Sequence, residues 1–188
     1  MIYKLLLSLL MTLPLCADSM IPSPIPAKNI TQQDNFITKT HTFTIGQRTL
    51  EYDSVAGSLL TKNQEDLKDA ANIYFTAYFL KSPAMTATPR PITFCFNGGP
   101  GSSSVWLHMG CLGPKIIVHK DLEYTTPPGT YKDNPFTLLT ETDLVFVDPV
   151  STGFSHPADG IDAKTFHGFD EDINSIAEFV RLFITRFN

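Results

Sequence analysis

A glycine-rich segment is the part of this chain whose residue types and spacing best suit chemistry. It reads NGGPGSSS over residues 97–104 and follows the apolar stretch 91–96. Glycines allow positive φ and remove side chains from the path of an approaching molecule. Such a loop can direct backbone N–H groups at a charged oxygen or a phosphate. The same residues also suit a tight turn that ends a strand, so the segment alone leaves both interpretations open.

The other residue types used in nucleophilic catalysis are not arranged for it. The serines of 102–104 have no base beside them, and capping of a following helix explains them better. Asp148 could be the acid of a catalytic triad, but an Asp-Pro step after a strand is more simply a turn. The histidines precede the core, lie in loops or near turns, or occupy a packing or surface position: His41, His108, His119, His156 and His167.

Composition limits the function classes. The chain has 188 residues, 43% hydrophobic and 18% charged, which suits one soluble domain with a real core. A net charge of −5 gives no reason to expect nucleic acid as a partner. We find no zinc-ligand spacing and no P-loop, and we predict no cofactor and no metal. Cys95 lies in an apolar stretch, so we expect a buried free thiol rather than a disulfide with Cys111.

The N-terminus is typical of an export signal. Residues 1–17 combine Lys4 with the apolar run 5–15, which is too short to span a bilayer comfortably. Cleavage after Ala17 predicts a periplasmic or secreted protein that leaves the membrane. Acylation of Cys16 is the alternative, but the bulky residue before it disfavours a lipoprotein signal.

Two further segments follow the signal peptide. Residues 18–40 are polar and rich in proline, which predicts an extended leader. Residues 41–188 form the predicted folded domain.

The elements that must position the glycine loop alternate between strands and helices. The predicted strands are 42–45, 48–52, 73–80, 91–96 and 144–147. We predict a short helix over 102–112 and a longer one over 170–187, with mostly irregular chain over 119–143. The long helix carries one apolar stripe: Ile173, Ile176, Ala177, Val180, Phe183, Ile184 and Phe187. This pattern predicts an α/β sheet with a site along the edge where the strands end.

Several short motifs together resemble the serine carboxypeptidase family of the α/β-hydrolase fold, in particular its bacterial members. They are 96–104 (FNGGPGSSS), 112–114 (LGP), 134–136 (NPF), 147–150 (VDPV) and 153–155 (GFS). The resemblance implies the N-terminal portion of an α/β-hydrolase: a mixed, mostly parallel sheet flanked by helices that ends before the nucleophile elbow.

The resemblance also implies an activity and site residues. Family members release the last residue of a peptide through a Ser-Asp-His triad and an acyl-enzyme. Here the Gly99 N–H matches an oxyanion-hole donor, and Asn97 and Gly98 match the residues that bind the substrate's terminal carboxylate. Peptides with a free C-terminal carboxylate are the implied partners. Cys111 stands where plant and fungal members have a glutamate, and Ser102 where many secreted members have a disulfide cysteine.

The nucleophile of the family is not found in the sequence. No G-x-S-x-G occurs in the 188 residues, and the nearest match, 153–157, lacks the final glycine. By analogy the triad lies beyond Asn188. We therefore expect a fragment that is inactive alone, with an unpaired strand edge, a partly exposed stripe on helix 170–187, and a downstream companion fragment as a partner. The alternatives are an exported, non-catalytic protein that binds peptide C-termini and a non-functional relic of a split gene.

Overall fold

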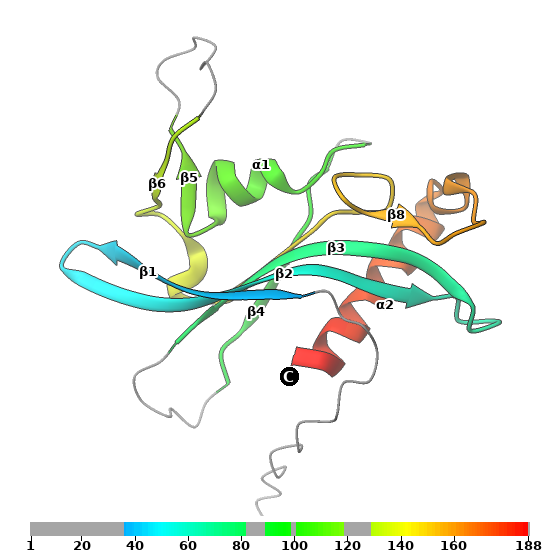
Figure 1. Cartoon of the computed structure of the whole chain (residues 1–188), viewed down its shortest axis with the longest axis horizontal. Helices are drawn as coiled ribbons and strands as arrows, with labels where there is room; N and C mark the ends of the chain where they lie inside the picture. The colour runs from blue at the N-terminus through cyan, green and yellow to red at the C-terminus, as the bar shows by residue number, and fades with distance from the viewer. Residues whose placement is uncertain (1–35, 82–88, 99–100, 119–128, 188) are drawn as a thin grey trace, which may run out of the picture. The chain divides into compact units, whose positions relative to one another are not determined.

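The computed structural model of the chain describes residues 36–81, 89–98, 101–118 and 129–187 (Figure 1). All of them fall in the unit Gln33–Asn188. The predicted signal peptide, 1–17, and the leader as far as residue 35 lie outside the described residues. In the described ranges, neither α-helix is long and apolar enough to cross a membrane.

Three long antiparallel strands begin the fold. They are β1 (Ile37–Ile45), β2 (Arg48–Lys62) and β3 (Asp69–Leu80). The predicted hairpin is confirmed, and Gly46 in its turn has a φ of +60°. β1 begins at Ile37, so residues 37–40, which the sequence assigns to the leader, belong to a strand. The reason is that β2 is long enough for its residues 53–56 to pair with 37–40.

Two shorter strands complete the central sheet. β7 (Asp143–Val147) pairs antiparallel with β3, and β4 (Ile92–Cys95) pairs parallel with β7. The order is β1-β2-β3-β7-β4, which leaves β4 at the edge, and β8 (His156–Pro157) pairs with β3.

The predicted mixed sheet is confirmed, but the parallel pairing expected for most strands occurs in the described part only between β4 and β7. The reason is that β1, β2 and β3 form an antiparallel meander joined by short connections.

Helices cover both faces of this sheet (Figure 1). α2 (Phe169–Phe187) packs on one face, where Phe179 and Phe183 are fully buried against Phe75. α1 (Val105–Leu107) and the π-helical turn η1 (His108–Leu112) lie on the other face, together with the 3₁₀ helix η2 (Leu138–Thr140). β7 is buried on both faces, which explains why it reads as a continuous apolar run.

Smaller elements differ from the sequence expectations. The helix predicted over 102–112 begins only at Val105. The stretch predicted as irregular contains β6 (Tyr131–Asp133), which pairs with β5 (Lys115–Ile117), as well as η2. The 3₁₀ helix η3 (Ala163–Phe166) precedes α2.

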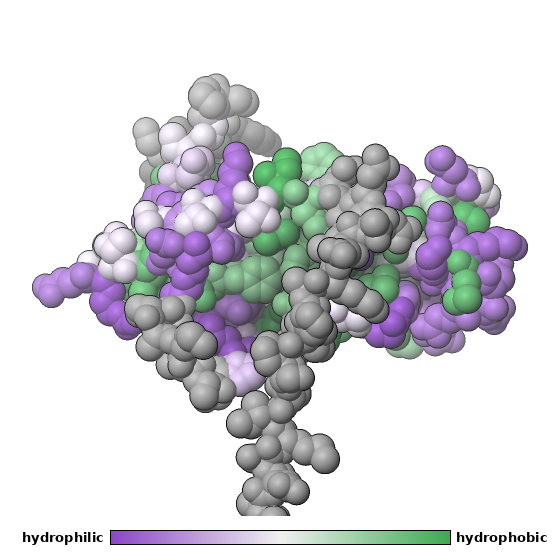
Figure 2. Space-filling model, turned by 60° about the horizontal axis from the view of Figure 1, so that its bottom comes forward, coloured by the Kyte–Doolittle hydropathy of each residue, from purple (hydrophilic) through white to green (hydrophobic). Residues whose placement is uncertain are grey.

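The apolar side of α2 is divided between the core and the surface. Phe179, which the predicted stripe omits, is at its buried centre with Phe183, whereas Ile173 and Ile184 are 51% and 41% exposed. Among the described residues, β4 pairs with β7 alone, so the expected unpaired strand edge and partly exposed helix are both found there. Figure 2 shows hydrophobic residues at the surface near the middle of the view, flanked by polar ones.

Candidate functional site

The glycine loop and the turn after β7 meet at one edge of the sheet. β4 and β7 run parallel, with Cys95 opposite Phe146, so the chain leaves both strands at the same edge. The loop of 97–104 follows β4, and the turn of 148–155 follows β7. Both segments therefore lie at the edge where the sequence predicts a site.

Of the three predicted site residues, the structure describes Asn97 and Gly98; Gly99 lies outside the described residues. The Asn97 side-chain amide donates to the Gly98 carbonyl at 3.0 Å and reaches the Ser102 hydroxyl at 3.5 Å, the outer limit of a hydrogen bond. Gly98 is exposed, and a Cβ built on it would meet nothing within 4 Å. The loop is therefore open to solvent at Gly98.

Ser104 fastens the loop to the ends of both strands. It is 1% exposed, and its hydroxyl lies against the carbonyl oxygens of Val147 and Cys95, to which it donates. The same oxygen accepts the Asn97 backbone N–H at 3.3 Å. Ser104 is the N-cap residue of α1, as the sequence predicts, but its hydroxyl makes no capping hydrogen bond to the helix.

The Asp148 carboxylate joins the loop to the turn. It is 9% exposed and accepts the backbone N–H of Ser104 at 2.8 Å and that of Phe154 at 3.4 Å. Gly153 has a φ of +51°, and a Cβ there would lie 1.9 Å from Asp148 Oδ2, so only glycine fits. The predicted turn is confirmed by the Thr152 N–H donating to the Pro149 carbonyl at 3.0 Å. Sequence reasoning missed the carboxylate's role, although the glycine five residues later was a signal.

Ser155, the serine of the nearest nucleophile-like match, is a structural residue. Its hydroxyl donates to the Asp148 carbonyl at 2.6 Å and accepts the Tyr74 backbone N–H at 2.8 Å. The first bond closes the turn on itself, and the second ties it to β3. The neighbouring Phe154 is 73% exposed, and its ring lies 5.0 Å from that of Tyr74. The turn thus presents an apolar surface next to the loop.

His108 is a packing residue, which is one of the two alternatives that the sequence leaves open. Its ring stacks on Phe146 at 4.6 Å and is hydrogen-bonded to the Tyr78 hydroxyl. Burial lowers the pKa of His108 to about 4 and raises the pKa of Tyr78. A neutral imidazole held in this way is not available as a base.

The remaining histidines that the structure describes do not contact the glycine loop, but one of them contacts the turn after β7. His41 contacts Ser54 at 2.9 Å, and His167 contacts Ser151 at 3.1 Å. His156 is exposed on β8. His119 lies outside the described residues.

Two further motifs of the chain, 112–114 and 134–136, are joined by hydrogen bonds. The buried Asn134 side chain donates to the carbonyls of Cys111 and Gly113 at 2.7 and 2.8 Å. A Cβ on Gly113 would lie 2.5 Å from the His108 carbonyl oxygen, so this position requires glycine. Cys111 is exposed and unpaired, while Cys95 is the buried free thiol that the sequence predicted. Burial raises the pKa of the Cys95 thiol.

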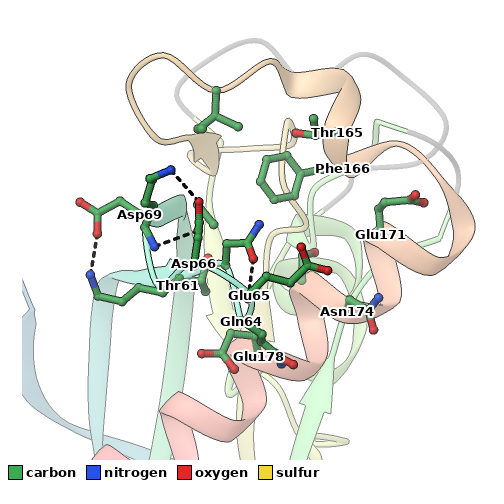
Figure 3. A pocket seen from close by; sticks show the side chains of 16 residues that line it. Thr61, Gln64, Glu65, Asp66, Asp69, Thr165, Phe166, Glu171, Asn174 and Glu178 are labelled. Carbon is green, nitrogen blue, oxygen red and sulfur yellow. Dashed lines mark hydrogen bonds and ion pairs between the residues drawn. The ribbon is translucent and has the colours of Figure 1, made fainter.

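A separate cavity of about 600 Å³ lies between the β2–β3 connection, η3 and the first half of α2 (Figure 3). It is lined by several carboxylates, and three of them are in ion pairs: Asp69 with Lys62, Asp66 with Lys68, and Glu178 with Arg181. The Arg181 guanidinium lowers the pKa of Glu178. In the described part of the chain, no group of His, Cys, Asp and Glu side chains is placed to hold a metal. None of the lining residues belongs to the loop or to the turn after β7.

Comparison with known proteins agrees with the motifs. The family model for serine carboxypeptidase matches residues 50–188. Serine-type carboxypeptidase F of Aspergillus niger is 30% identical over 90 residues, which are 46% of this chain and 15% of that protein. Serine carboxypeptidase-like 36 of Arabidopsis thaliana is 33% identical over 91 residues, 48% of this chain and 17% of that protein.

The matched segments thus span less than a fifth of either curated relative. The family match, in contrast, covers the glycine loop, the turn after β7 and every element from β3 onward. The chain belongs to the serine carboxypeptidase family, an α/β-hydrolase family.

Proposed function

We propose that this chain is the N-terminal part of a serine carboxypeptidase. It supplies the groups of that enzyme that bind the negatively charged parts of the substrate. Asn97 and Gly98 bind the terminal carboxylate of a peptide, and the Gly99 N–H binds the oxyanion. The observation that carries the proposal is the opening at Gly98 beside the loosely held Asn97 amide.

The chemistry follows from the donors of the loop. The Asn97 amide N–H that reaches Ser102 at 3.5 Å is the one that a carboxylate takes over, since its other N–H is well bonded. Binding a terminal carboxylate selects chain ends over internal peptide bonds. A backbone donor such as the Gly99 N–H stabilises the charge that develops when a nucleophile attacks the scissile carbonyl, by about 3 kcal/mol.

The attacking serine comes, in this proposal, from sequence outside the 188 residues. No nucleophile elbow occurs in them, and the 188-residue chain alone therefore hydrolyses no peptide bond. A polypeptide that carries the elbow covers the free edge of β4 and the exposed Ile173 and Ile184 of α2. Two observations support this partner: a strand edge with one neighbour, and half-exposed isoleucines beside a packed core.

We also propose that the protein is exported to the periplasm or the medium. The support is the signal-like segment 1–17, which lies outside the described residues. The mature protein then starts at Asp18.

The binding proposal is tested by titrating the 188-residue chain with N-benzoyl-glycyl-phenylalanine and, separately, with its C-terminal amide. We expect the acid to bind and the amide to bind about tenfold more weakly or worse, since hydrogen bonds to a charged group are the stronger ones. Asn97→Ala weakens binding of the acid, whereas Asn174→Ala, an exposed asparagine on α2, leaves it unchanged. Equal affinity for acid and amide contradicts the proposal. Release of phenylalanine that a serine-reactive phosphonate blocks contradicts the predicted inactivity.

A further inference from the structure

Asp148 is a buried carboxylate without a cationic partner. It is 9% exposed, and in the described ranges no Lys, Arg or His forms an ion pair with it. A charge is buried at a high free-energy cost unless hydrogen bonds compensate it. Here the compensating groups are backbone N–H groups. The hydrogen bonds to the carboxylate therefore hold the main chain around Asp148 in place.

Each oxygen of the carboxylate holds a different loop. Oδ1 accepts the N–H of Ser104 at 2.8 Å, and Oδ2 accepts the N–H of Phe154 at 3.4 Å. Gly153 brings the second loop close, since any side chain there would overlap Oδ2. The Gly153 position also lies 3.0 Å, measured from an added Cβ, from the Ser103 side chain, so the two loops touch.

Asp148 is linked through Ser104 to Asn97, one of the residues that we propose to bind the substrate's carboxylate. Its backbone is held by Asp148, and its hydroxyl accepts the backbone N–H of Asn97 at 3.3 Å. Where Ser104 lies therefore determines where the Asn97 main chain lies. We propose that Asp148 is a positioning residue for substrate binding: it holds Asn97 and Gly98 in the geometry that accepts a peptide's terminal carboxylate. This inference rests on the proposed function.

The test compares Asp148→Asn with Asp143→Asn. Asparagine keeps one acceptor oxygen but turns an NH₂ group toward the other backbone N–H, which releases one of the two loops. Asp143 is the matched control: it lies at the opposite end of β7, is part-buried, and accepts from Arg90 at 3.0 Å and from the Leu80 N–H at 3.1 Å. Both changes lower the melting temperature, so a purely structural role predicts similar effects for both.

Two readouts separate positioning from stability. Well below both melting temperatures, Asp148→Asn weakens binding of N-benzoyl-glycyl-phenylalanine about tenfold, and Asp143→Asn does not. Without ligand, hydrogen exchange of the Asn97 N–H speeds up about tenfold in Asp148→Asn and not in the control. Ser104→Ala, which removes the acceptor of that N–H, gives the same exchange result if Asp148→Asn does not fold.

Failures of the two proposals give different results. Unchanged Asn97 exchange in the variants overturns the positioning role, whatever the ligand does. Unchanged affinity in Asp148→Asn, with a wild-type chain that distinguishes acid from amide, also overturns it and leaves the proposed function intact. Faster exchange in a chain that binds acid and amide equally supports the positioning of the loop and contradicts the proposed function.

Discussion

Among the described residues, Ser104 makes more hydrogen bonds around the loop than the serines next to it. Its buried hydroxyl lies between the loop and the carbonyls of β4 and β7, whereas Ser102 makes one hydrogen bond to a described residue, at 3.5 Å. We predict that Ser104→Ala lowers the free energy of unfolding by about 1–3 kcal/mol, because it leaves buried polar groups unsatisfied. Ser102→Ala changes it by less than about 0.5 kcal/mol. Urea unfolding of both variants measures the difference, and equal effects contradict this assignment.

His108 makes stability depend on pH. Its pKa is about 4 in the folded chain, because of burial, and about 6.5 when unfolded, so between these values the unfolded state binds more protons. The contribution of neutral His108 to the free energy of unfolding is therefore complete above pH 6.5. It is lost as the pH falls toward 4, by roughly 3 kcal/mol in total.

The prediction is checked by urea unfolding of wild type and His108→Leu at pH 7 and pH 5. We expect wild type to lose more stability than the variant between these pH values. The comparison removes the contribution of carboxylates such as Asp133 and Glu178, whose pKa values are lowered by Lys115 and Arg181 and which weaken the fold in acid in both proteins. The same pH dependence in both proteins contradicts the role given to His108.

At the scale of elements, α2 offers a comparison between neighbours. Phe183 is fully buried against the sheet, and Ile184 is 41% exposed. We predict that Phe183→Ala costs about 3–5 kcal/mol of stability. Ile184→Ala costs below about 1 kcal/mol, since much of its side chain is already in water. Denaturant unfolding measures both, and similar costs contradict the orientation of α2.

The elements that the sequence predicted best are those with one strong local pattern. The hairpin turn at Gly46, the strands β4 and β7 and the extent of α2 all follow from local periodicity and composition. Much of the predicted stripe of α2, including Phe183, does pack against the core. The centre of the buried side could not be predicted, because Phe179 and Ile173 are both apolar and only the sheet decides between them. The start of β1 depends on the length of β2, which is a pairing property and not a local one.

The whole molecule explains which parts of the site escaped prediction. The loop motif indicates Asn97 and Gly98 directly, since the proposed binding groups are a side-chain amide and the exposed main chain of a glycine. The partners of Ser104 and Asp148 lie on the other loop, more than forty residues away in sequence, and only the parallel pairing of β4 with β7 brings them together. A motif therefore indicates the residues that we propose for ligand binding more readily than the residues that hold the loop in place.

The central claim is that Asn97 and Gly98 receive a terminal carboxylate. The most direct measurement is a ¹H–¹⁵N NMR titration of the labelled 188-residue chain with N-benzoyl-glycyl-phenylalanine. The account predicts that the Gly98 backbone and Asn97 side-chain amide signals shift with the acid and stay in place with its C-terminal amide. Shifts confined to other residues, such as those that line the cavity beside α2, would contradict it.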